Sequence, residues 1–307
     1  MISMWQELSD SLRAGDTRGL ARSISLVENE QDGYMEFLQA LPAGNTPILG
    51  ITGPPGAGKS TLTDALIGEF VKAGKKVAVL CIDPSSPFNL GALLGDRIRM
   101  SQWYNHPDVF IRSLANRGNL GGLHPMIIEI TEIMKATPFD HIIIETVGIG
   151  QSEIEIAGLA DITVVVLVPE AGDEIQTMKA GLMEIADIFV VNKSDRPDAE
   201  LFVRNLRQML SPVYHRQQRE IPVIKTVASE ASGVPELMEA ILHQDGVQSG
   251  ERKVYLLTRK AWQMLQRIRM KDFDIQDIRS RLEEKMKGGD FNLVRFVNEV
   301  AASKNDR

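Results

Sequence analysis

A glycine-rich loop between an apolar run and a helical run constrains this chain more than any other feature. Residues 48–52 are apolar, and residues 59–73 have the periodicity of an amphipathic helix. The loop fits the phosphate-loop pattern G-x-x-x-x-G-K-[ST] and reads Gly53, Pro54, Pro55, Gly56, Ala57, Gly58, Lys59, Ser60 and Thr61. Glycines let backbone N–H groups curl around phosphate oxygens, and the helix N-terminus favours their negative charge. The pattern predicts a nucleotide phosphate site in which Lys59 reaches the β- and γ-phosphates and Ser60 offers its hydroxyl to Mg²⁺.

Apolar runs alternate with helical segments through the middle of the chain. Strands are expected at residues 48–52, 76–82, 109–113, 141–145, 162–168, 188–192 and 222–227. Helices are expected between most of them, for example at residues 59–73 and 126–135. Because strands this apolar need cover on both faces, the alternation predicts an α/β fold with a mostly parallel P-loop NTPase sheet and helices on both faces.

Both ends of the chain read as helical. Residues 1–45 are expected to form an N-terminal helical extension that is interrupted at Gly15-Asp16, and residues 46–248 a P-loop domain. Residues 249–307 are expected to form a C-terminal helical extension whose last helix is capped by Asp290. Two apolar stripes run along this extension, one of Val254, Leu257, Ala261, Leu265 and Ile268 and one of Ile275, Ile278, Leu282 and Met286.

Composition and charge exclude several classes of protein. With 307 residues, 43% of them hydrophobic, the chain is long enough for one large domain with accessory helices and too apolar for disorder. The longest strongly apolar run, 162–168, is far shorter than the roughly 20 residues of a membrane span, and no secretory signal is visible. A single cysteine cannot form an internal disulfide, so the cytoplasm is the expected compartment. The net charge is −7, but residues 251–307 are basic, with 14 Lys/Arg and 9 Asp/Glu. The first 250 residues are therefore acidic, which argues against nucleic-acid binding.

A second motif indicates which base the nucleotide carries. Asn192-Lys193-Ser194-Asp195 places the pattern N-K-x-D at the end of an apolar strand, where open α/β sheets bind ligands. The Asp195 carboxylate can accept hydrogen bonds from the guanine ring N–H and the exocyclic amine together, and adenine has no matching pair of donors. Downstream of a phosphate loop, the motif therefore predicts GTP rather than ATP.

Acidic residues suited to Mg²⁺ lie between these two motifs. Asp83 and Glu145 each end an expected strand, and Asp96 lies in a Leu-Gly-Asp-Arg run. An acid at a strand end beside a phosphate loop can hold Mg²⁺ directly or through water. The glycines that follow Glu145 favour a mobile switch, in which Gln151 either orients the catalytic water or has a structural role.

Further runs accompany these motifs in a fixed order. They are Asp83-Pro84-Ser85-Ser86-Pro87, Leu94-Gly95-Asp96-Arg97-Ile98-Arg99-Met100, Arg117-Gly118-Asn119-Leu120-Gly121-Gly122, Glu145-Thr146-Val147-Gly148-Ile149-Gly150-Gln151-Ser152-Glu153 and Gly172-Asp173-Glu174-Ile175-Gln176. With the phosphate loop and the N-K-x-D motif, they resemble the MeaB/ArgK family of P-loop GTPases over residues 48 to about 240. The Asp-Pro-Ser-Ser-Pro and Glu-Thr-Val-Gly-x-Gly-Gln runs separate this family from other P-loop GTPases. The chain departs from the family's usual residues at Asn89-Leu90-Gly91, Asn119 and Val227-Ala228.

This resemblance implies an activity and a partner. Members of the family are GTPases that act as chaperones of adenosylcobalamin-dependent methylmalonyl-CoA mutase and related acyl-CoA mutases, gating delivery or exchange of the cobalamin cofactor. Residues 170–179 would form a switch that faces the mutase, and the C-terminal helices would support a homodimer. The base of GTP or GDP would be supported by the backbone at Val227 and Ala228. The implied Mg²⁺ ligands are Ser60, Asp83, Asp96 and Glu145.

Other classes of function compete with this one. A nickel metallochaperone GTPase of similar fold needs a Cys/His cluster, whereas this chain has one cysteine and five scattered histidines. A nucleotide-dependent kinase of amino-acid transport is disfavoured by the guanine motif and by the lack of an H-R-D catalytic loop. A cobalamin enzyme would need an Asp-x-His-x-x-Gly motif, which the chain lacks. Because no arginine finger stands out among Arg97, Arg99, Arg112 and Arg117, slow turnover that a partner or dimerisation accelerates is expected.

Overall fold

A computed structural model describes residues 4–83, 100–117, 123–146, 155–171, 183, 185–217, 220–244, 250–287 and 291–305. The chain divides into two compact units, Met1–Lys253 and Val254–Arg307. The first unit contains a β-sheet with its covering helices and an N-terminal group of helices, and the second unit is helical.

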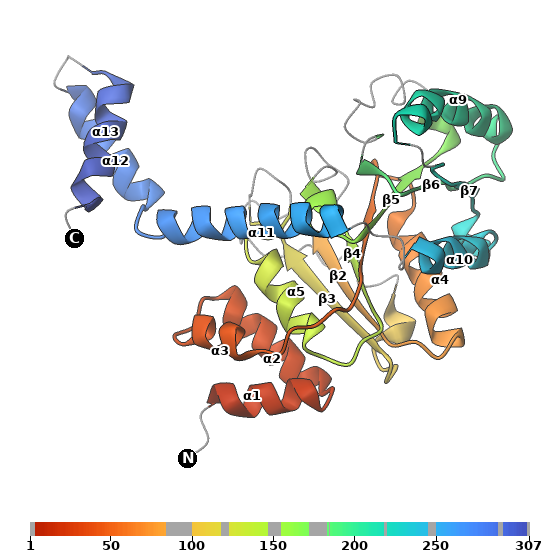
Figure 1. Ribbon diagram of the computed structural model, residues 1–307, viewed down its shortest axis with the longest axis horizontal. Coiled ribbons are helices and arrows are strands. Elements are labelled where there is room, and N and C mark those ends of the chain that lie inside the picture. The colour runs from red at the N-terminus through yellow and green to blue at the C-terminus, as the bar shows by residue number, and fades with distance from the viewer. Residues whose placement is uncertain are drawn as a thin grey trace. The chain divides into compact units, whose positions relative to one another are not determined.

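A seven-stranded sheet forms the centre of the first unit (Figure 1). In chain order its strands are β1 (Ile48–Thr52), β2 (Val77–Asp83), β3 (Val109–Ala115), β4 (His141–Glu145), β5 (Ile162–Leu167), β6 (Ile188–Val191) and β7 (Val223–Lys225). Their spatial order is β3-β2-β4-β1-β5-β6-β7, and every neighbouring pair is parallel. The predicted α/β fold with a parallel sheet is confirmed, and β1 lies in its middle.

The strand bounds differ from the expected ones at several ends, most of all in β7. The expected run 222–227 is reduced to Val223–Lys225. Pro222 has no N–H to donate to the ladder. Beyond the strand, the Thr226 hydroxyl donates to the side chain of Asn192, and Val227 pairs in the antiparallel sense with Ser232. The strand therefore ends where the chain turns to make loop contacts.

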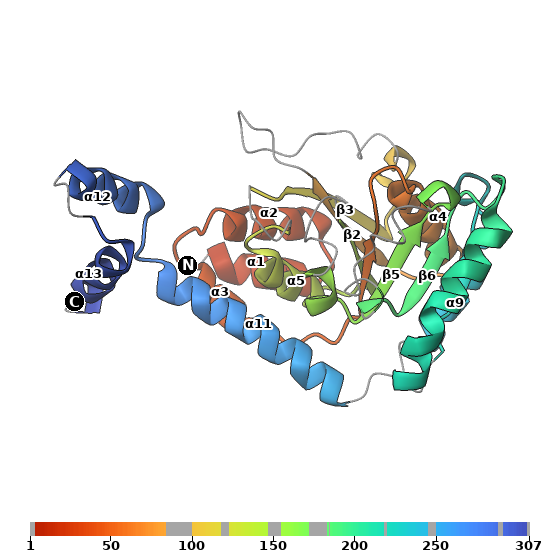
Figure 2. The same cartoon turned by 90° about the horizontal axis from the view of Figure 1, so that it is seen from above.

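Helices cover both faces of the sheet, as predicted. Helices α4 (Lys59–Lys72) and α10 (Val234–Gln244) pack on one face, in a core that includes Leu66, Val79, Ile143, Val164, Val190 and Leu237. Helix α9 (Ala199–Gln217) packs on the other face, in a core that includes Val165, Leu167, Phe189, Val191, Phe202 and Leu206. Figure 2 shows α4 and α9 on the two sides of β5 and β6. Successive residues of one strand thus enter opposite cores, which explains why the strands are apolar throughout.

The N-terminal helices are attached to the body of the first unit. They are α1 (Met4–Arg13), α2 (Thr17–Glu28) and α3 (Tyr34–Ala40). The predicted interruption is confirmed, since Gly15 has φ +73° and the Asp16 carboxylate accepts from the N–H groups of Arg18 and Gly19 at 3.0 Å each. Helices α2 and α3 contact α5 (Ile127–Lys135), which links β3 to β4 (Figure 1).

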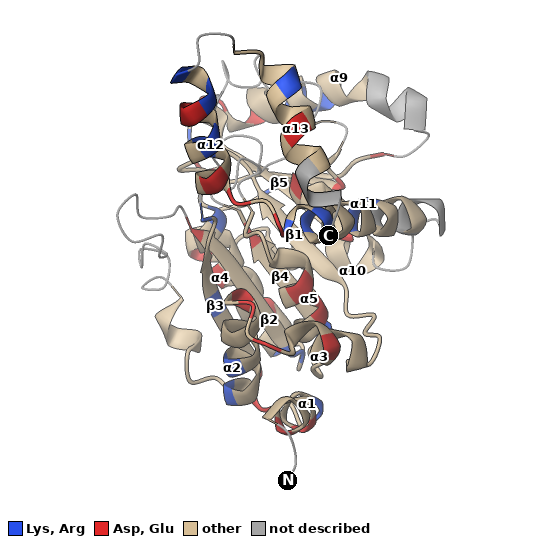
Figure 3. Ribbon diagram, turned by 90° about the vertical axis from the view of Figure 1, so that its left-hand side faces the viewer, with Lys and Arg blue, Asp and Glu red and all other residues tan. Residues whose placement is uncertain are grey.

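The second unit contains most of α11 (Gly250–Met270), together with α12 (Ile275–Lys287) and α13 (Leu293–Asn305). Both predicted apolar stripes lie on helices, the first on α11 and the second on α12. Basic and acidic residues are interspersed along α12 (Figure 3), where Arg281 and Asp277 form an ion pair at 3.0 Å. The predicted cap Asp290 lies outside the described residues, and the side chain of Asn292 accepts from the N–H of Arg295 at the start of α13. Among the helices that the structure describes, none is both long and apolar enough to cross a membrane.

Candidate nucleotide site

The sequence motifs converge at the carboxyl edge of the parallel sheet. The phosphate loop leaves the central strand β1 and enters α4, while Asp83 and Glu145 end β2 and β4. Asn192 follows β6 directly. Open α/β sheets bind ligands at this edge, where loops from neighbouring strands meet. The fold therefore brings together residues that are far apart in the sequence.

Two positions of the loop require glycine, because atoms of neighbouring segments lie where a Cβ atom would be. Gly53 has φ +140°, and a Cβ atom built on it would lie 2.1 Å from the carbonyl oxygen of Val166 in β5. Gly58 has φ +88°, and its Cβ would lie 2.4 Å from Nδ2 of Asn192. A side chain at either position would push the loop away from the neighbouring strand ends. The glycines thus allow the loop to close against the sheet.

Lys59 lies inside the phosphate loop. Its side chain is buried, with 7% exposure, and its Nζ donates to the carbonyl oxygens of Gly53 at 2.9 Å and Pro54 at 3.0 Å. These bonds hold the ammonium group against the backbone at the start of the loop. A cation in this position can compensate charge on phosphate oxygens, as a phosphate-loop lysine does.

Ser60 and Glu145 meet beside the loop. The Ser60 hydroxyl donates to Oε1 of Glu145 at 2.5 Å, and both residues are buried. In the parallel register Cys81 is opposite Glu145, so Asp83, two residues further along β2, points to the same face of the sheet. That face is the one covered by α4, which begins at Lys59 next to Ser60.

These oxygen-bearing side chains fit a Mg²⁺ ion. Hydroxyl and carboxylate oxygens are the ligands that Mg²⁺ accepts beside phosphates. Ser60 and Glu145 are in contact, and Asp83 has 2% exposure at the adjoining strand end. Asp96, the remaining acid of the predicted set, lies outside the described residues, as does Gln151.

The side-chain amide of Asn192 connects three segments of the site. Its Nδ2 donates to the carbonyl oxygen of Ala57 in the phosphate loop at 2.9 Å. Its Oδ1 accepts from the backbone N–H of Ala228 and from the hydroxyl of Thr226, both at 3.1 Å. The guanine motif is therefore bonded to the phosphate loop on one side and to the loop after β7 on the other. Thr226 was not predicted, and no motif in the sequence indicates it.

The other motif residues line the same edge. Lys193 has φ +55° and its Nζ donates to the carbonyl oxygen of Gly56 at 2.8 Å, which adds a second link between the two motifs. Asp195 is exposed at the end of this turn. Val227 and Ala228 follow at the loop after β7, where the Ala228 N–H contacts Asn192. The structure thus brings the predicted phosphate and base residues to adjacent loops.

One ion pair joins Arg196, the residue directly after the guanine motif, to the start of the predicted partner switch. Arg196 contacts Glu170 in the short helix η3 (Pro169–Ala171). The hydrogen bond from Arg196 lowers the pKa of the Glu170 carboxyl below its usual range. The remainder of the predicted switch, 172–179, lies outside the described residues.

Two of the candidate arginine fingers are bonded to the N-terminal helices. Arg112 donates to Oε2 of Glu28 at 3.1 Å, and Arg117 donates to Oε1 of Glu28 at 2.9 Å. Their guanidinium groups thus contact α2 in this structure. Arg97 and Arg99 lie outside the described residues.

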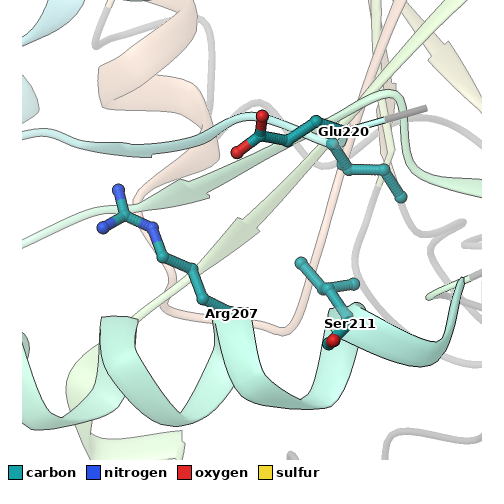
Figure 4. A pocket seen from close by; sticks show the side chains of 5 residues that line it. Arg207, Ser211 and Glu220 are labelled. Carbon is teal, nitrogen blue, oxygen red and sulfur yellow. The ribbon is translucent and has the colours of Figure 1, made fainter. Parts of the chain in front are cut away.

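A separate cavity of about 270 Å³ lies beside the edge strand β7 (Figure 4). Arg207 and Ser211 reach it from α9, and Glu220 reaches it from the segment before β7. Because Glu220 precedes the strand, the cavity lies at the amino edge of the sheet. It is therefore distinct from the site at the carboxyl edge.

Sequence comparison connects these features with known proteins. The family described as "Methylmalonyl Co-A mutase-associated GTPase MeaB" matches residues 20–281. A protein of Pyrococcus abyssi that bears a GTPase name is 49% identical over 78% of this chain and 75% of its own length. GTPase ArgK of Escherichia coli is 37% identical over 75% of this chain and 73% of its own length.

Two further relatives differ in architecture or in name. The fused isobutyryl-CoA mutase of Geobacillus kaustophilus is 38% identical over 72% of this chain, and the match covers 22% of that longer protein. A solved structure described as a LAO/AO transport system kinase is 25% identical, with a TM-score of 0.67 over 98% of both chains. This similarity along the chain supports the P-loop NTPase fold.

Substitution of Asn192 by alanine should destabilise the protein. The change would leave the Ala57 carbonyl and the Ala228 N–H without their present partner in a buried setting, at a cost of about 1–3 kcal/mol per unsatisfied group. Urea denaturation measures the free energy of unfolding. Asn205→Ala, on the exposed side of α9, is the matched control and should change that free energy by less than about 0.5 kcal/mol. Equal stability of the two variants would contradict the bridging role of Asn192.

Proposed function

Because this chain belongs to the MeaB family of methylmalonyl-CoA mutase-associated GTPases, we propose that it hydrolyses GTP to GDP in a Mg²⁺-dependent reaction and serves as a chaperone for an adenosylcobalamin-dependent acyl-CoA mutase. The observation that carries the nucleotide part is the bond from Asn192 to Ala57, which joins a guanine-type motif to a phosphate loop. The two motifs then act on one ligand, with its phosphates at Lys59 and its base at Asp195.

The phosphate loop supplies binding and charge compensation. Backbone N–H groups at the start of α4 would donate to phosphate oxygens, and the helix dipole would favour their charge. The Lys59 ammonium, which donates to Gly53 and Pro54, is close enough to the loop interior to exchange one of these bonds for a phosphate oxygen. The residues proposed to bind the phosphates are Gly53, Pro54, Pro55, Gly56, Ala57, Gly58, Lys59, Ser60 and Thr61.

The acidic edge would hold the metal ion. Mg²⁺, when bound, neutralises charge on the β- and γ-phosphate oxygens. The contact between Ser60 and Glu145 supports a role for both oxygens, since it places them side by side next to the loop. The proposed ligand set is Ser60, Asp83, Asp96 and Glu145.

Hydrolysis needs a positioned water molecule and charge stabilisation in the transition state. We assign Gln151 to orienting the water, which attacks the γ-phosphorus and displaces GDP. Arg112 and Arg117 contact Glu28, so neither guanidinium is directed to the nucleotide in this arrangement. The other two candidates, Arg97 and Arg99, lie outside the described residues. We propose that a group supplied by the partner or by a second copy accelerates hydrolysis, and that the isolated chain turns over slowly.

The mutase assignment rests on the family and on a fused relative. In the fused isobutyryl-CoA mutase, a segment similar to this chain is part of the same polypeptide as a mutase. Fusion keeps two proteins together permanently, which is advantageous when they act on one another. The segment 170–179 is our candidate for the mutase-facing switch, and its first residue Glu170 is bonded to Arg196, which directly follows the guanine motif.

A homodimer is proposed for the C-terminal helices. On α11, apolar side chains of the predicted stripe are exposed, with Val254 at 64%, Leu265 at 54% and Ile268 at 49%. Contiguous exposed apolar side chains on one helix are typical of an interaction surface. A second copy of the same helix would cover them.

Asp195→Ala should reduce the preference for GTP over ATP by about 100-fold or more, because two hydrogen bonds to a charged acceptor are lost. Competitive binding of the two nucleotides measures this ratio. In Asp195→Asn, the amide would donate to the 2-oxo group of xanthine, so xanthosine triphosphate should bind better than GTP. Glu200→Ala, at an exposed acid of α9, is the control and should keep the wild-type ratio. An unchanged ratio in Asp195→Ala would refute the guanine assignment.

Addition of an adenosylcobalamin-dependent acyl-CoA mutase should raise the GTP hydrolysis rate by about 10-fold or more, as expected when a partner completes the stabilisation of the transition state. Phosphate release with and without the mutase measures the effect. Lys59→Ala should abolish hydrolysis in both cases, whereas Lys72→Ala, at the exposed last residue of α4, should not. Rapid hydrolysis by the isolated chain, or no response to such mutases, would contradict the proposal.

Leu265→Glu should convert the proposed dimer into a monomer, because a charged side chain would be buried without a partner at the helix interface. Light scattering measures the mass in solution. The matched control is Leu201→Glu, since Leu201 is an equally exposed leucine on α9 with 50% exposure. A wild-type monomer, or a dimer that survives Leu265→Glu, would rule out this surface.

A further inference from the structure

The carboxylate of Glu28 is bonded to two arginines of the sheet region. Glu28 is the last residue of α2, and its side chain has 15% exposure. Its Oε2 accepts from Arg112 at 3.1 Å, and its Oε1 accepts from Arg117 at 2.9 Å. The side chain of His124, which is fully buried, places Nε2 3.6 Å from the same Oε1. The contact with His124, and after it the hydrogen bond and charge of Arg112, lower the pKa of Glu28 to about 2.

The two arginines connect Glu28 to different parts of β3. Arg112 lies in the middle of the strand, opposite Leu80 of β2, and also donates to the hydroxyl of Ser25 at 3.0 Å. Arg117 lies beyond the strand end and makes a second bond, from Nη1 to the carbonyl oxygen of Glu28 at 3.2 Å. One carboxylate thus holds the strand at its middle and the turn at its carboxyl end.

The turn at Arg117 adjoins the acidic edge of the candidate site. Ala115 is the register partner of Asp83, and the N–H of Asn116 donates to the carbonyl oxygen of Asp83 at 3.0 Å. Arg117 follows with φ +49°, a left-handed conformation that residues with a Cβ rarely adopt. Such a conformation persists where the surroundings hold it. Here the two bonds from its guanidinium to Glu28 hold it.

We propose that Glu28 is a positioning residue for the Mg²⁺ side of the nucleotide site. Through Arg117 it holds the Asn116 turn against the backbone of Asp83, and so helps to fix the direction of that carboxylate. The N-terminal helices are then part of the nucleotide site, although no residue of theirs lies in a nucleotide motif. This inference rests on the proposed Mg²⁺-dependent GTPase function.

Arg112 provides the internal control for this inference. It contacts the same carboxylate as Arg117, and it also contributes to attaching α2. Its register partner Leu80 lies three residues before Asp83, so loss of Arg112 leaves the Asn116 turn in place. A purely structural role of Glu28 would affect variants of both arginines alike. A positioning role affects the metal only through Arg117.

The test measures binding of a fluorescent GDP to the full chain, first in EDTA and then during titration with Mg²⁺. The Mg²⁺ half-effect is the Mg²⁺ concentration at which the change in GDP binding is half complete. Arg117→Met and Glu28→Gln should raise it about 10-fold, as for changes in residues that orient metal ligands. Their GDP affinity in EDTA should stay within about twofold of wild type, because the phosphate loop and guanine motif are unchanged. Arg112→Met should lower the melting temperature and leave the Mg²⁺ half-effect at its wild-type value.

Several outcomes would overturn the inference. An unchanged Mg²⁺ half-effect in a folded Arg117→Met protein would do so, and so would equal shifts in the Arg112 and Arg117 variants. If Arg117→Met fails to fold, Glu28→Gln tests the same contact, and an Mg²⁺ half-effect equal to that of wild type in that variant would count equally against the inference. The combined Glu28→Gln and Arg117→Met variant should have the Mg²⁺ half-effect of the Arg117 single variant, since Arg117→Met already removes both bonds from this guanidinium to Glu28. A wild-type chain whose nucleotide binding is indifferent to Mg²⁺ would instead overturn the proposed function, and the inference with it.

Discussion

The side-chain amide of Asn192 is the interaction on which the candidate site depends. One nitrogen and one oxygen join the phosphate loop, the turn after β6 and the loop after β7 in a buried position. The close approach at Gly58 exists because this amide occupies the space where a Cβ would lie. Parallel strands deliver their loops to one edge, but they do not fix the spacing of those loops. The amide fixes it, and a ligand that spans the phosphate and base positions would find both at a set separation.

Much of the fold could be predicted from local patterns. Apolar runs for β1 and β4 match the observed strands residue for residue, since each is bounded by a turn or a polar residue. Gly15 and Asp16 were sufficient to place the break between α1 and α2, because a positive φ and a side-chain cap are local properties. The end of β7 was not predictable in this way. It depends on Thr226 and Val227 bonding to Asn192 and Ser232, which are contacts of the folded chain.

In the candidate site, too, some features are local in the sequence and others depend on contacts in the folded chain. The phosphate loop and the N-K-x-D motif could be recognised because each is a short run of residue types that fits one kind of ligand group. The contact between Ser60 and Glu145 depends on β4 lying next to β1 in the sheet, and this strand order cannot be read from the sequence alone. Glu28 lies in no motif, and the sequence indicates its partners Arg112 and Arg117 only as possible arginine fingers. Only the packing of α2 beside β3 turns these three charges into one network.

The attachment of α2 also bears on whether the N-terminal helices can be exchanged between related proteins. A helix that merely covers a sheet can be replaced by another helix of similar size. Glu28 instead meets two guanidinium groups and an imidazole, so a foreign helix without an acid at that point would leave a cluster of positive charge beside a strand end. Exchange of the N-terminal helices between relatives should therefore succeed only when the incoming helix has an acid at this point or when the recipient strand is exchanged with it. For such exchanges, the N-terminal helices and β3 form one unit with the sheet.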